Sequence, residues 1–130
     1  MERGTLRRYQ MRRGLALADM APALREGERQ DTRKHTKHPL RPEADAVAAA
    51  LEGRIDWDAF ADRYSAAVRA RRADDPAPYD ALAELARERD VFLGCSCPTR
   101  KQPDVHRCHT VLALRLMAEW YPDLDVRLPD

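Results

Sequence analysis

Residues 91–97 read Val-Phe-Leu-Gly-Cys-Ser-Cys, and this short apolar run decides the fold. Its length and composition predict a strand buried on both faces. A polar loop then leads to residues 108–121, where apolar side chains cover most of the circumference of a predicted helix, so we expect that helix to be largely buried. The apolar members of that helix are Val111, Leu112, Leu114, Leu116, Met117 and Trp120.

A second strand is predicted after this helix. Pro122 ends the helix, and Leu124–Leu128 then alternates apolar with charged residues, which is typical of a half-buried strand. A strand, a buried helix and another strand in this order predict a right-handed βαβ unit with parallel strands.

Two amphipathic helices are predicted ahead of the buried strand. Asp56 is a good N-cap for the first, which runs to about Arg72. The second ends near Arg89. Their apolar stripes recur at helical spacing and are assigned to the core. The stripes consist of Trp57, Phe60, Tyr64 and Val68 in the first helix, and Tyr79, Leu82, Leu85 and Ala86 in the second.

The amino-terminal part carries weaker patterns. Thr5–Met11 predicts an edge strand or a loose arm, and Leu15–Leu24 has a modest helical pattern. Residues 25–42 are polar and predict a long loop, whereas Ala44–Leu51 predicts a short helix ended by Gly53. We therefore expect residues 1–130 to form a single α/β domain with a short parallel sheet of two to three strands flanked by helices. In that domain, residues 55–130 form the core, and residues 1–54 are basic and partly loop.

Charge and composition exclude several classes of protein. The 130 residues carry a formal charge of +1, which excludes the overall basicity of a typical nucleic-acid-binding domain. No run of 18 apolar residues is present, and the start of the chain lacks the apolar core of a secretory signal, so we expect no membrane association. The three cysteines are an odd number and all lie within residues 95–108, which favours a reducing, cytoplasmic location over a disulfide scaffold.

The segment from Gly94 to Thr110 concentrates the residues that carry chemistry. It joins the carboxyl end of a predicted parallel strand to the amino end of a helix, which is the usual ligand crevice of an open α/β sheet. The unpaired N–H groups and the dipole of that helix end attract anions. The segment holds Cys95, Cys97, Cys108, His106, His109, Arg100, Lys101 and Arg107.

We assign roles to these residues as a hypothesis. Cys97 or Cys108 is the reactive thiol, and the helix dipole and Arg107 favour the thiolate of Cys108. His109 or His106 donates or accepts the proton. An anion is held by the helix amino end and by Arg100 and Arg107, with further ligand contacts from Cys95 and Thr110. Gly94 leaves room for a ligand or a second backbone to approach the strand closely.

Other interpretations of the same cysteines stay open. They are small enough to be buried simply as hydrophobic residues. Cys95, Cys97 and Cys108 with His109 or His106 could instead coordinate zinc, although the spacing C-x-C-x10-C-H differs from the usual zinc signatures. A redox pair of two cysteines lacks the supporting C-x-x-C motif.

A second cluster of positive charge lies in the predicted loop. Residues 33–38 read Arg-Lys-His-Thr-Lys-His, and the simplest interpretation is a solvated loop. The functional alternative is a basic lid over the crevice or along a phosphate backbone. The partners that these patterns predict are an anionic small molecule or a nucleic-acid phosphate, and the sequence indicates no oligomeric state.

From about Trp57 to Leu128 the chain resembles the family known as domain of unknown function 488. The resemblance rests on the aromatic helix, the apolar strand that ends in a cysteine, the Cys-His pair at residues 108 and 109 that opens a helix, and the closing strand. It implies a three-layer α/β fold with its site at Cys95 or Cys97 together with Cys108 and His109. The family's reaction is not established, so the resemblance implies a site and not a reaction.

The chain departs from that family in three respects. Thr110 stands where family members usually carry an arginine after the Cys-His pair. The loop before Cys108 is longer than usual, which leaves a substitute role for Arg100 open. Nothing in residues 1–54 matches the family's amino-terminal strands, which predicts a shortened or divergent member.

The sequence thus favours a protein with a crevice that binds an anionic ligand, such as a nucleotide or another phosphate-containing molecule, and that is catalytic if Cys97 or Cys108 is reactive. No cofactor is needed in this interpretation. The alternative is a zinc-stabilised module that binds nucleic acid or protein without catalysis.

Overall fold

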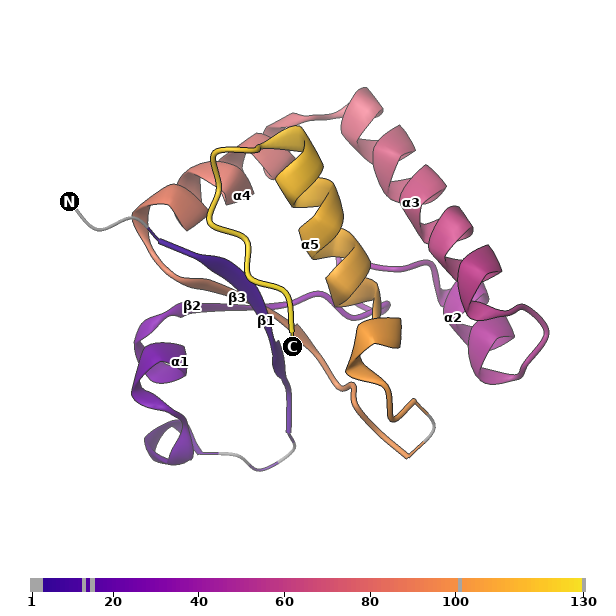
Figure 1. Ribbon diagram of the computed structural model, residues 1–130, viewed down its shortest axis with the longest axis horizontal. Helices are drawn as coiled ribbons and strands as arrows, with labels where there is room; N and C mark the ends of the chain where they lie inside the picture. Colours follow the sequence, from indigo (N-terminus) through magenta and orange to yellow (C-terminus); the bar gives the residue numbers. More distant parts are fainter. Residues whose placement is uncertain (1–3, 13, 15, 101, 130) are drawn as a thin grey trace.

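The protein is built on a small parallel sheet. The computed structural model describes residues 4–12, 14, 16–100 and 102–129. Among these residues the sheet has three strands, β1 (Leu6–Gln10), β2 (Glu28–Asp31) and β3 (Val91–Cys95), in the order β1-β3-β2 with both pairings parallel. Helices flank the sheet (Figure 1), and the predicted α/β fold class is confirmed.

The helices are arranged in layers around the sheet. α5 packs against β1 and β3, α3 packs against α5, and α2 packs against α3 (Figure 1). No helix in the described part of the chain is both long and apolar enough to cross a membrane. In chain order the helical segments, with η for a 3-10 helix, are η1 (Leu17–Asp19), α1 (Pro22–Glu26), α2 (Ala44–Leu51), α3 (Trp57–Asp74), α4 (Ala77–Glu88), η2 (Val105–Arg107) and α5 (His109–Trp120).

The apolar run that begins at Val91 forms a buried strand, as predicted, and this strand is the central one of the sheet. Every residue of β3 is buried, and β1 and β2 pair with its two edges. The register places Leu6 of β1 and Glu28 of β2 opposite Val91. β3 ends at Cys95, two residues before the predicted end of the strand, and the chain then leaves the sheet.

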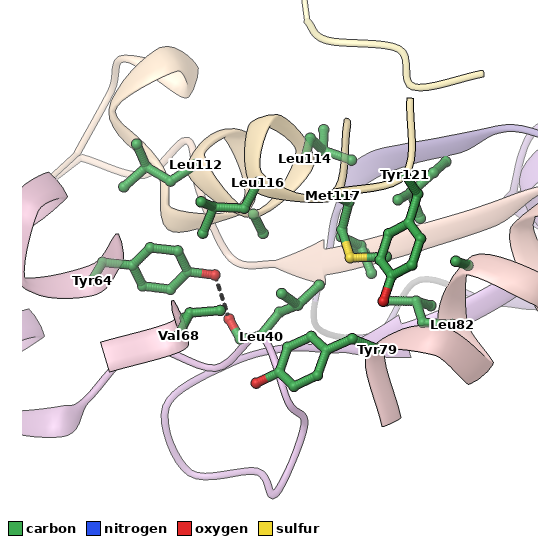
Figure 2. Close-up of a cluster of buried hydrophobic side chains, with 14 of the residues drawn as sticks. Leu40, Tyr64, Val68, Tyr79, Leu82, Leu112, Leu114, Leu116, Met117 and Tyr121 are labelled. Atoms are coloured by element: carbon green, nitrogen blue, oxygen red, sulfur yellow. Dashed lines mark hydrogen bonds between the residues drawn. The ribbon is translucent and has the colours of Figure 1, made fainter. Parts of the chain in front are cut away.

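The main core lies between the sheet and the helices of one face. Alternate side chains of the strands, including Leu6, Val91 and Leu93, point toward α5 and are completely buried. Figure 2 shows how this core extends between α3, α4 and α5, and how Tyr64 reaches the segment that precedes α2 through a hydrogen bond from its hydroxyl to the carbonyl of Leu40 at 2.7 Å. The core thus fixes both α5 and the segment around Leu40.

Side chains on the opposite face of the sheet explain why residue 94 is a glycine. Tyr9 meets Phe92 edge-on on this face, and the guanidinium of Arg7 lies 5.0 Å from the Phe92 ring centroid. A Cβ atom on Gly94 would come within 2.9 Å of the side chains of Tyr9 and Met11. The glycine therefore makes room for these two side chains and not for a ligand, which corrects the role that we expected for it.

The helices predicted around the core are observed. α2 spans Ala44–Leu51 as predicted, with Gly53 behind it at a φ of 74°. Asp56 caps α3 by accepting a hydrogen bond from the backbone N–H of Ala59 at 2.8 Å. α4 and α5 also cover the predicted ranges to within a few residues.

Two predictions in the amino-terminal part are wrong. Leu15–Leu24 is not one helix: η1 and the short α1 replace it, and Pro22 starts α1 because its fixed φ suits the first turn (Leu15 lies outside the described residues). The predicted loop at residues 25–42 contains β2. β2 is a half-buried edge strand with the sequence Glu-Arg-Gln-Asp, so it lacks the apolar alternation that signals a strand. Thr5–Met11 holds an edge strand, one of the two forms predicted for it.

The closing strand predicted at Leu124–Leu128 is reduced to a single parallel bridge between Leu6 and Val126. Two backbone hydrogen bonds of 2.9 Å hold it, from Leu6 to Asp125 and from Arg127 to Leu6. The ladder stops there because Leu128 turns out to solvent and Pro129 has no N–H to donate. The predicted βαβ unit is therefore β3, α5 and one bridge beside β1.

Candidate functional site

The candidate site lies where β2 and β3 end side by side. Since the two strands are parallel, their carboxyl ends meet at one edge of the sheet. Thr32 continues this pairing: its backbone N–H and its hydroxyl both donate to the carbonyl of Gly94, at 3.1 and 3.0 Å. The residues after Thr32 are thereby held next to the residues after Gly94, beneath the first turn of α5 (Figure 1).

Three free cysteines converge at this edge, an arrangement that the sequence left open as one of several interpretations. The sulfur atoms of Cys95, Cys97 and Cys108 all lie within 4.8 Å of one another. Cys95 is the last residue of β3, and Cys108 is the N-cap residue of α5. His109 completes the group, with its Nδ1 atom 3.8 Å from the Cys95 sulfur and 4.0 Å from the Cys108 sulfur. We call these four residues the floor of the site.

The orientation of the His109 ring follows from its hydrogen bonds. Its Nε2 atom lies 2.8 Å from the hydroxyl oxygen of Thr32 and 3.1 Å from the carbonyl oxygen of Thr32. That hydroxyl already gives its proton to Gly94, so both oxygens accept from Nε2–H. Nδ1 is therefore the nitrogen that faces the sulfur atoms, with either a proton or a lone pair.

The floor favours a thiolate beside an imidazolium. Hydrogen bonding with the thiols of Cys95 and Cys97, and with His109, lowers the pKa of Cys108 well below its ordinary value despite burial. Hydrogen bonds to the other two cysteines raise the pKa of Cys97. Burial lowers the pKa of His109, but hydrogen bonding to Cys108 and Cys95 outweighs it and raises this pKa to about 9. The charge of the floor therefore concentrates on Cys108 and His109.

Arg8 and Thr110 form a chain of hydrogen bonds that ends at the Cys108 sulfur. The hydroxyl of Thr110 donates to this sulfur at 3.1 Å and accepts from Nε of Arg8 at 2.9 Å. Arg8 also donates to the carbonyl oxygen of Cys97 at 2.6 Å. Thr110 stands where the resemblance leads one to expect an arginine, and the guanidinium that contacts its hydroxyl is that of Arg8 from β1. The sequence gives no local signal for Arg8, which lies about a hundred residues away.

The floor opens into a cavity of about 380 Å³. Part of the lining is an apolar wall, and three cationic side chains and a histidine also line the cavity. The wall consists of Pro42, Val47, Ala50, Leu51, Trp57 and Phe60, and the remaining polar lining comes from Ser96, Thr99 and Gln102. The three cationic residues and the histidine, which we call the rim, are Arg33, Lys34, Arg107 and His35.

The predicted site residues fall into two groups. Cys95, Cys97, Cys108, His109 and Arg107 line the cavity, and Thr110 lies directly behind it. Arg100 and His106 are exposed and are not among the residues that line the cavity.

The rim comes mostly from the segment that the sequence suggested only as a basic lid. Arg33, Lys34 and His35 line the cavity, whereas His38 does not. His38 is instead fixed between the side chain of Gln30 and the backbone N–H of Leu40. The sequence could not show which residues of this segment line the cavity, because their placement depends on β2.

The fold and the site together define a small α/β protein with a Cys-His crevice at the carboxyl edge of a parallel sheet. A family model described as the active DUF488-N3 subclade matches residues 6–121. The chain therefore belongs to the family of domain of unknown function 488. The match includes β1, β2 and α2, so the family extends further toward the amino terminus than the resemblance from Trp57 indicated. No curated protein and no solved structure matches the chain.

Proposed function

We propose that the cavity binds a small organic anion and that the Cys108 thiolate attacks it. The observation that carries this proposal is the combination in one cavity of a thiol-imidazole floor, an apolar wall and a cationic rim. The description of the matching subclade as active also supports a catalytic protein. Three free thiols this close together require a reducing environment, which is why we place the protein in the cytoplasm.

The lining limits the class of ligand. Arginine, lysine and histidine around the opening favour a phosphate or carboxylate group. Trp57 and Phe60 offer apolar and aromatic area to a flat or apolar part of the same molecule. A nucleotide or another phosphate-bearing metabolite has both features. The cavity is small, about 380 Å³, and a large part of its lining is apolar, which favours a small molecule over an extended nucleic acid.

The proposed chemistry is a displacement at an electrophilic atom of the ligand, with the Cys108 sulfur as nucleophile, followed by hydrolysis. The Cys108 thiolate forms a bond to an electrophilic atom of the ligand while the bond to the leaving group breaks, and the leaving group takes the Nδ1 proton of His109. Water then attacks the sulfur-bound group, gives one proton back to His109 and releases the Cys108 thiolate. Each turn thus consumes one water molecule and restores both side chains.

A pair of small alkylating agents tests the floor and the rim together. Iodoacetate is anionic and iodoacetamide is its neutral analogue of the same size. We expect iodoacetate to react with Cys108 at least as fast as iodoacetamide at pH 7 and low ionic strength, whereas free N-acetylcysteine, measured in parallel, shows a lower ratio of the two rates. Mass spectrometry of peptides assigns the modified cysteine, and Cys108→Ser is the matched variant that removes the fast reaction.

Two results contradict the proposal. One is a ratio of rates equal to that of N-acetylcysteine, because a cationic cavity attracts the anionic reagent. The other is fast labelling that persists in Cys108→Ser at Cys95 or Cys97, because the proposal assigns the thiolate to Cys108.

A second candidate function is a soft-metal site in a binding module. The observation that favours it is the mutual distance of at most 4.8 Å between the three sulfur atoms, with Nδ1 of His109 turned toward two of them. Anchoring of Nε2–H on Thr32 is also typical of a histidine that binds a metal through its other nitrogen. The donor set of three cysteines and one histidine suits zinc.

Elemental analysis of the purified protein separates the two candidates. One equivalent of zinc that resists dialysis, with unfolding on chelation and no alkylation before chelation, supports the metal site. Metal-free protein that is folded and reacts at Cys108 eliminates it.

A further inference from the structure

We infer that Arg33 is the residue that binds the negative group of the ligand and that Asp31 positions it for this task. The inference rests on the proposed function and deepens it, since it names one residue of the rim and the partner that holds it. From the sequence, Asp31 was not predicted as a site residue, and Arg33 was suggested only as part of a basic lid.

The Arg33 guanidinium is fixed by a two-point contact with Asp31. Nε donates to Oδ1 at 3.0 Å, and Nη2 donates to Oδ2 at 2.9 Å. The backbone N–H of Arg33 donates to the same Oδ1 at 2.9 Å, so the carboxylate holds both ends of the residue. These bonds with Arg33 lower the pKa of Asp31, which stays ionised. A side chain held in this way loses little conformational entropy when a ligand binds.

The fixed guanidinium still has donors for a ligand. Among the described residues, no hydrogen bond involves Nη1 of Arg33. The residue lines the cavity, and Thr32, its neighbour in the chain, is bonded to Gly94 beside the floor. Arg33 and Cys95 of the floor line the same cavity. An anion bound there lies beside the floor.

The other rim residues are held less firmly. The side chain of Arg107 is 59% exposed, and its carboxylate partner Asp104 lies 4.0 Å away. His35 is 61% exposed and lies 3.8 Å from Asp31. Lys34 is exposed. Arg33, at 36% exposed, is the least solvated of the four and the only one of them with a two-point contact among the described residues.

The contact between Asp31 and Arg33 leads to a prediction for Asp31→Asn that is opposite in sign to the effect of charge alone. Removing the negative charge of Asp31 should strengthen the attraction for an anion if charge alone matters. If Asp31 acts by positioning Arg33, the same removal weakens anion selectivity, because the freed guanidinium samples many conformations. Asp31→Asn separates the two cases, and it keeps the side-chain oxygen that accepts from the backbone N–H of Arg33.

The experiment measures the ratio of the alkylation rates of Cys108 with iodoacetate and with iodoacetamide, at low ionic strength, in each variant. We expect Arg33→Gln and Asp31→Asn each to lower the ratio by about three- to tenfold, the effect of one charge-assisted hydrogen bond weakened by solvent. Arg33→Lys keeps the charge without the fork, so we expect it to recover only part of the ratio. In a variant that has lost its structure, the rates with both reagents change and their ratio shows no preference for the anion. Thermal melting identifies such a variant.

Two matched controls change the same groups elsewhere. Arg25→Gln removes an exposed arginine in the last turn of α1. Asp123→Asn breaks another two-point contact, with Arg87 at 2.7 and 3.2 Å, and neither residue is among those that line the cavity. We expect the ratio in both controls to equal that of the unmodified protein.

The outcomes separate this inference from the proposed function. An unchanged ratio in Arg33→Gln, or a raised ratio in Asp31→Asn, overturns the inference while the proposed function stands. A ratio in the unmodified protein that equals that of N-acetylcysteine overturns the proposed function itself.

Discussion

The floor and the rim of the cavity are built on opposite principles. Cys95, Cys108 and His109 of the floor are buried and held by β3 and the first turn of α5, both of which belong to the apolar core. The rim is at least one-third exposed and comes mainly from the polar segment after β2, an edge strand. The floor therefore depends on packing, whereas the rim depends on a few polar contacts. Substitutions that affect only the floor or only the rim test this difference.

The largest effect is expected from the strand beneath the floor. Leu93 is completely buried in the core, so Leu93→Ala should lower the free energy of unfolding by about 2–5 kcal/mol. On the strand that carries the rim, Glu28→Ala removes only a partly exposed ion pair of 3.7 Å with Arg89 and should cost less than about 1 kcal/mol. Urea unfolding measures both, and equal costs would contradict the division.

The same division explains what the sequence could predict. β3, α3, α4 and α5 bury apolar stripes, and their periodicity is visible in the sequence at Trp57, Phe60 and Leu82. The floor was accessible for the same reason: its cysteines and histidine sit at the ends of two predictable elements. β2 has no apolar stripe, so neither the strand nor its consequence for Arg33 could be predicted.

Contacts across the sheet could not be predicted from the sequence either. Arg8 and Thr110 are about a hundred residues apart, and their hydrogen bond exists only because β1 pairs with β3 and α5 crosses both strands. The single bridge at Val126 is the opposite case, a predicted strand that forms only one bridge. Its alternating sequence has the local properties of a strand, but the pairing stops where Leu128 becomes exposed.

The second prediction concerns acid. Burial, together with the positive charge of His109, lowers the pKa of His38 to about 4, and the backbone N–H of Leu40 donates to its Nδ1. The unfolded chain binds this proton more tightly, with a pKa of about 6.5. The stability that neutral His38 allows is therefore full above pH 6.5 and is lost as the pH falls from 6.5 toward 4, by up to about 3 kcal/mol.

Urea unfolding at a series of pH values measures this loss, and an NMR titration of His38 gives its pKa directly. His38→Gln cannot titrate and should lack this part of the acid dependence. If the two proteins lose stability in parallel between pH 6.5 and 4, His38 is not the group responsible.

The third prediction concerns the link between the core and the segment that leads from the rim to α2. Tyr64→Phe removes the hydroxyl that donates to the Leu40 carbonyl, and both groups are buried (Figure 2). The carbonyl is left without this partner, so we expect a loss of about 1–3 kcal/mol in the free energy of unfolding. Tyr79→Phe is the control, because its hydroxyl donates to the carbonyl of Pro39, which is partly buried and also accepts from Nη1 of Arg71 at 3.1 Å. A larger loss in Tyr79→Phe than in Tyr64→Phe would contradict this view of the segment.

The smallest effect is expected within the floor itself, where stability and reactivity can be separated. Thr110→Val keeps the shape of the side chain but removes the O–H group that donates to the Cys108 sulfur at 3.1 Å. A hydrogen bond to a charged acceptor favours the charged form, so its loss should raise the pKa of Cys108. The rate of iodoacetamide alkylation against pH measures this shift. Thr36→Val, which removes a hydroxyl bonded to the carbonyl of Arg33 in the rim, should leave the midpoint in place. A midpoint that moves in Thr36→Val and not in Thr110→Val would mean that the rim, and not the support behind Cys108, controls the thiolate.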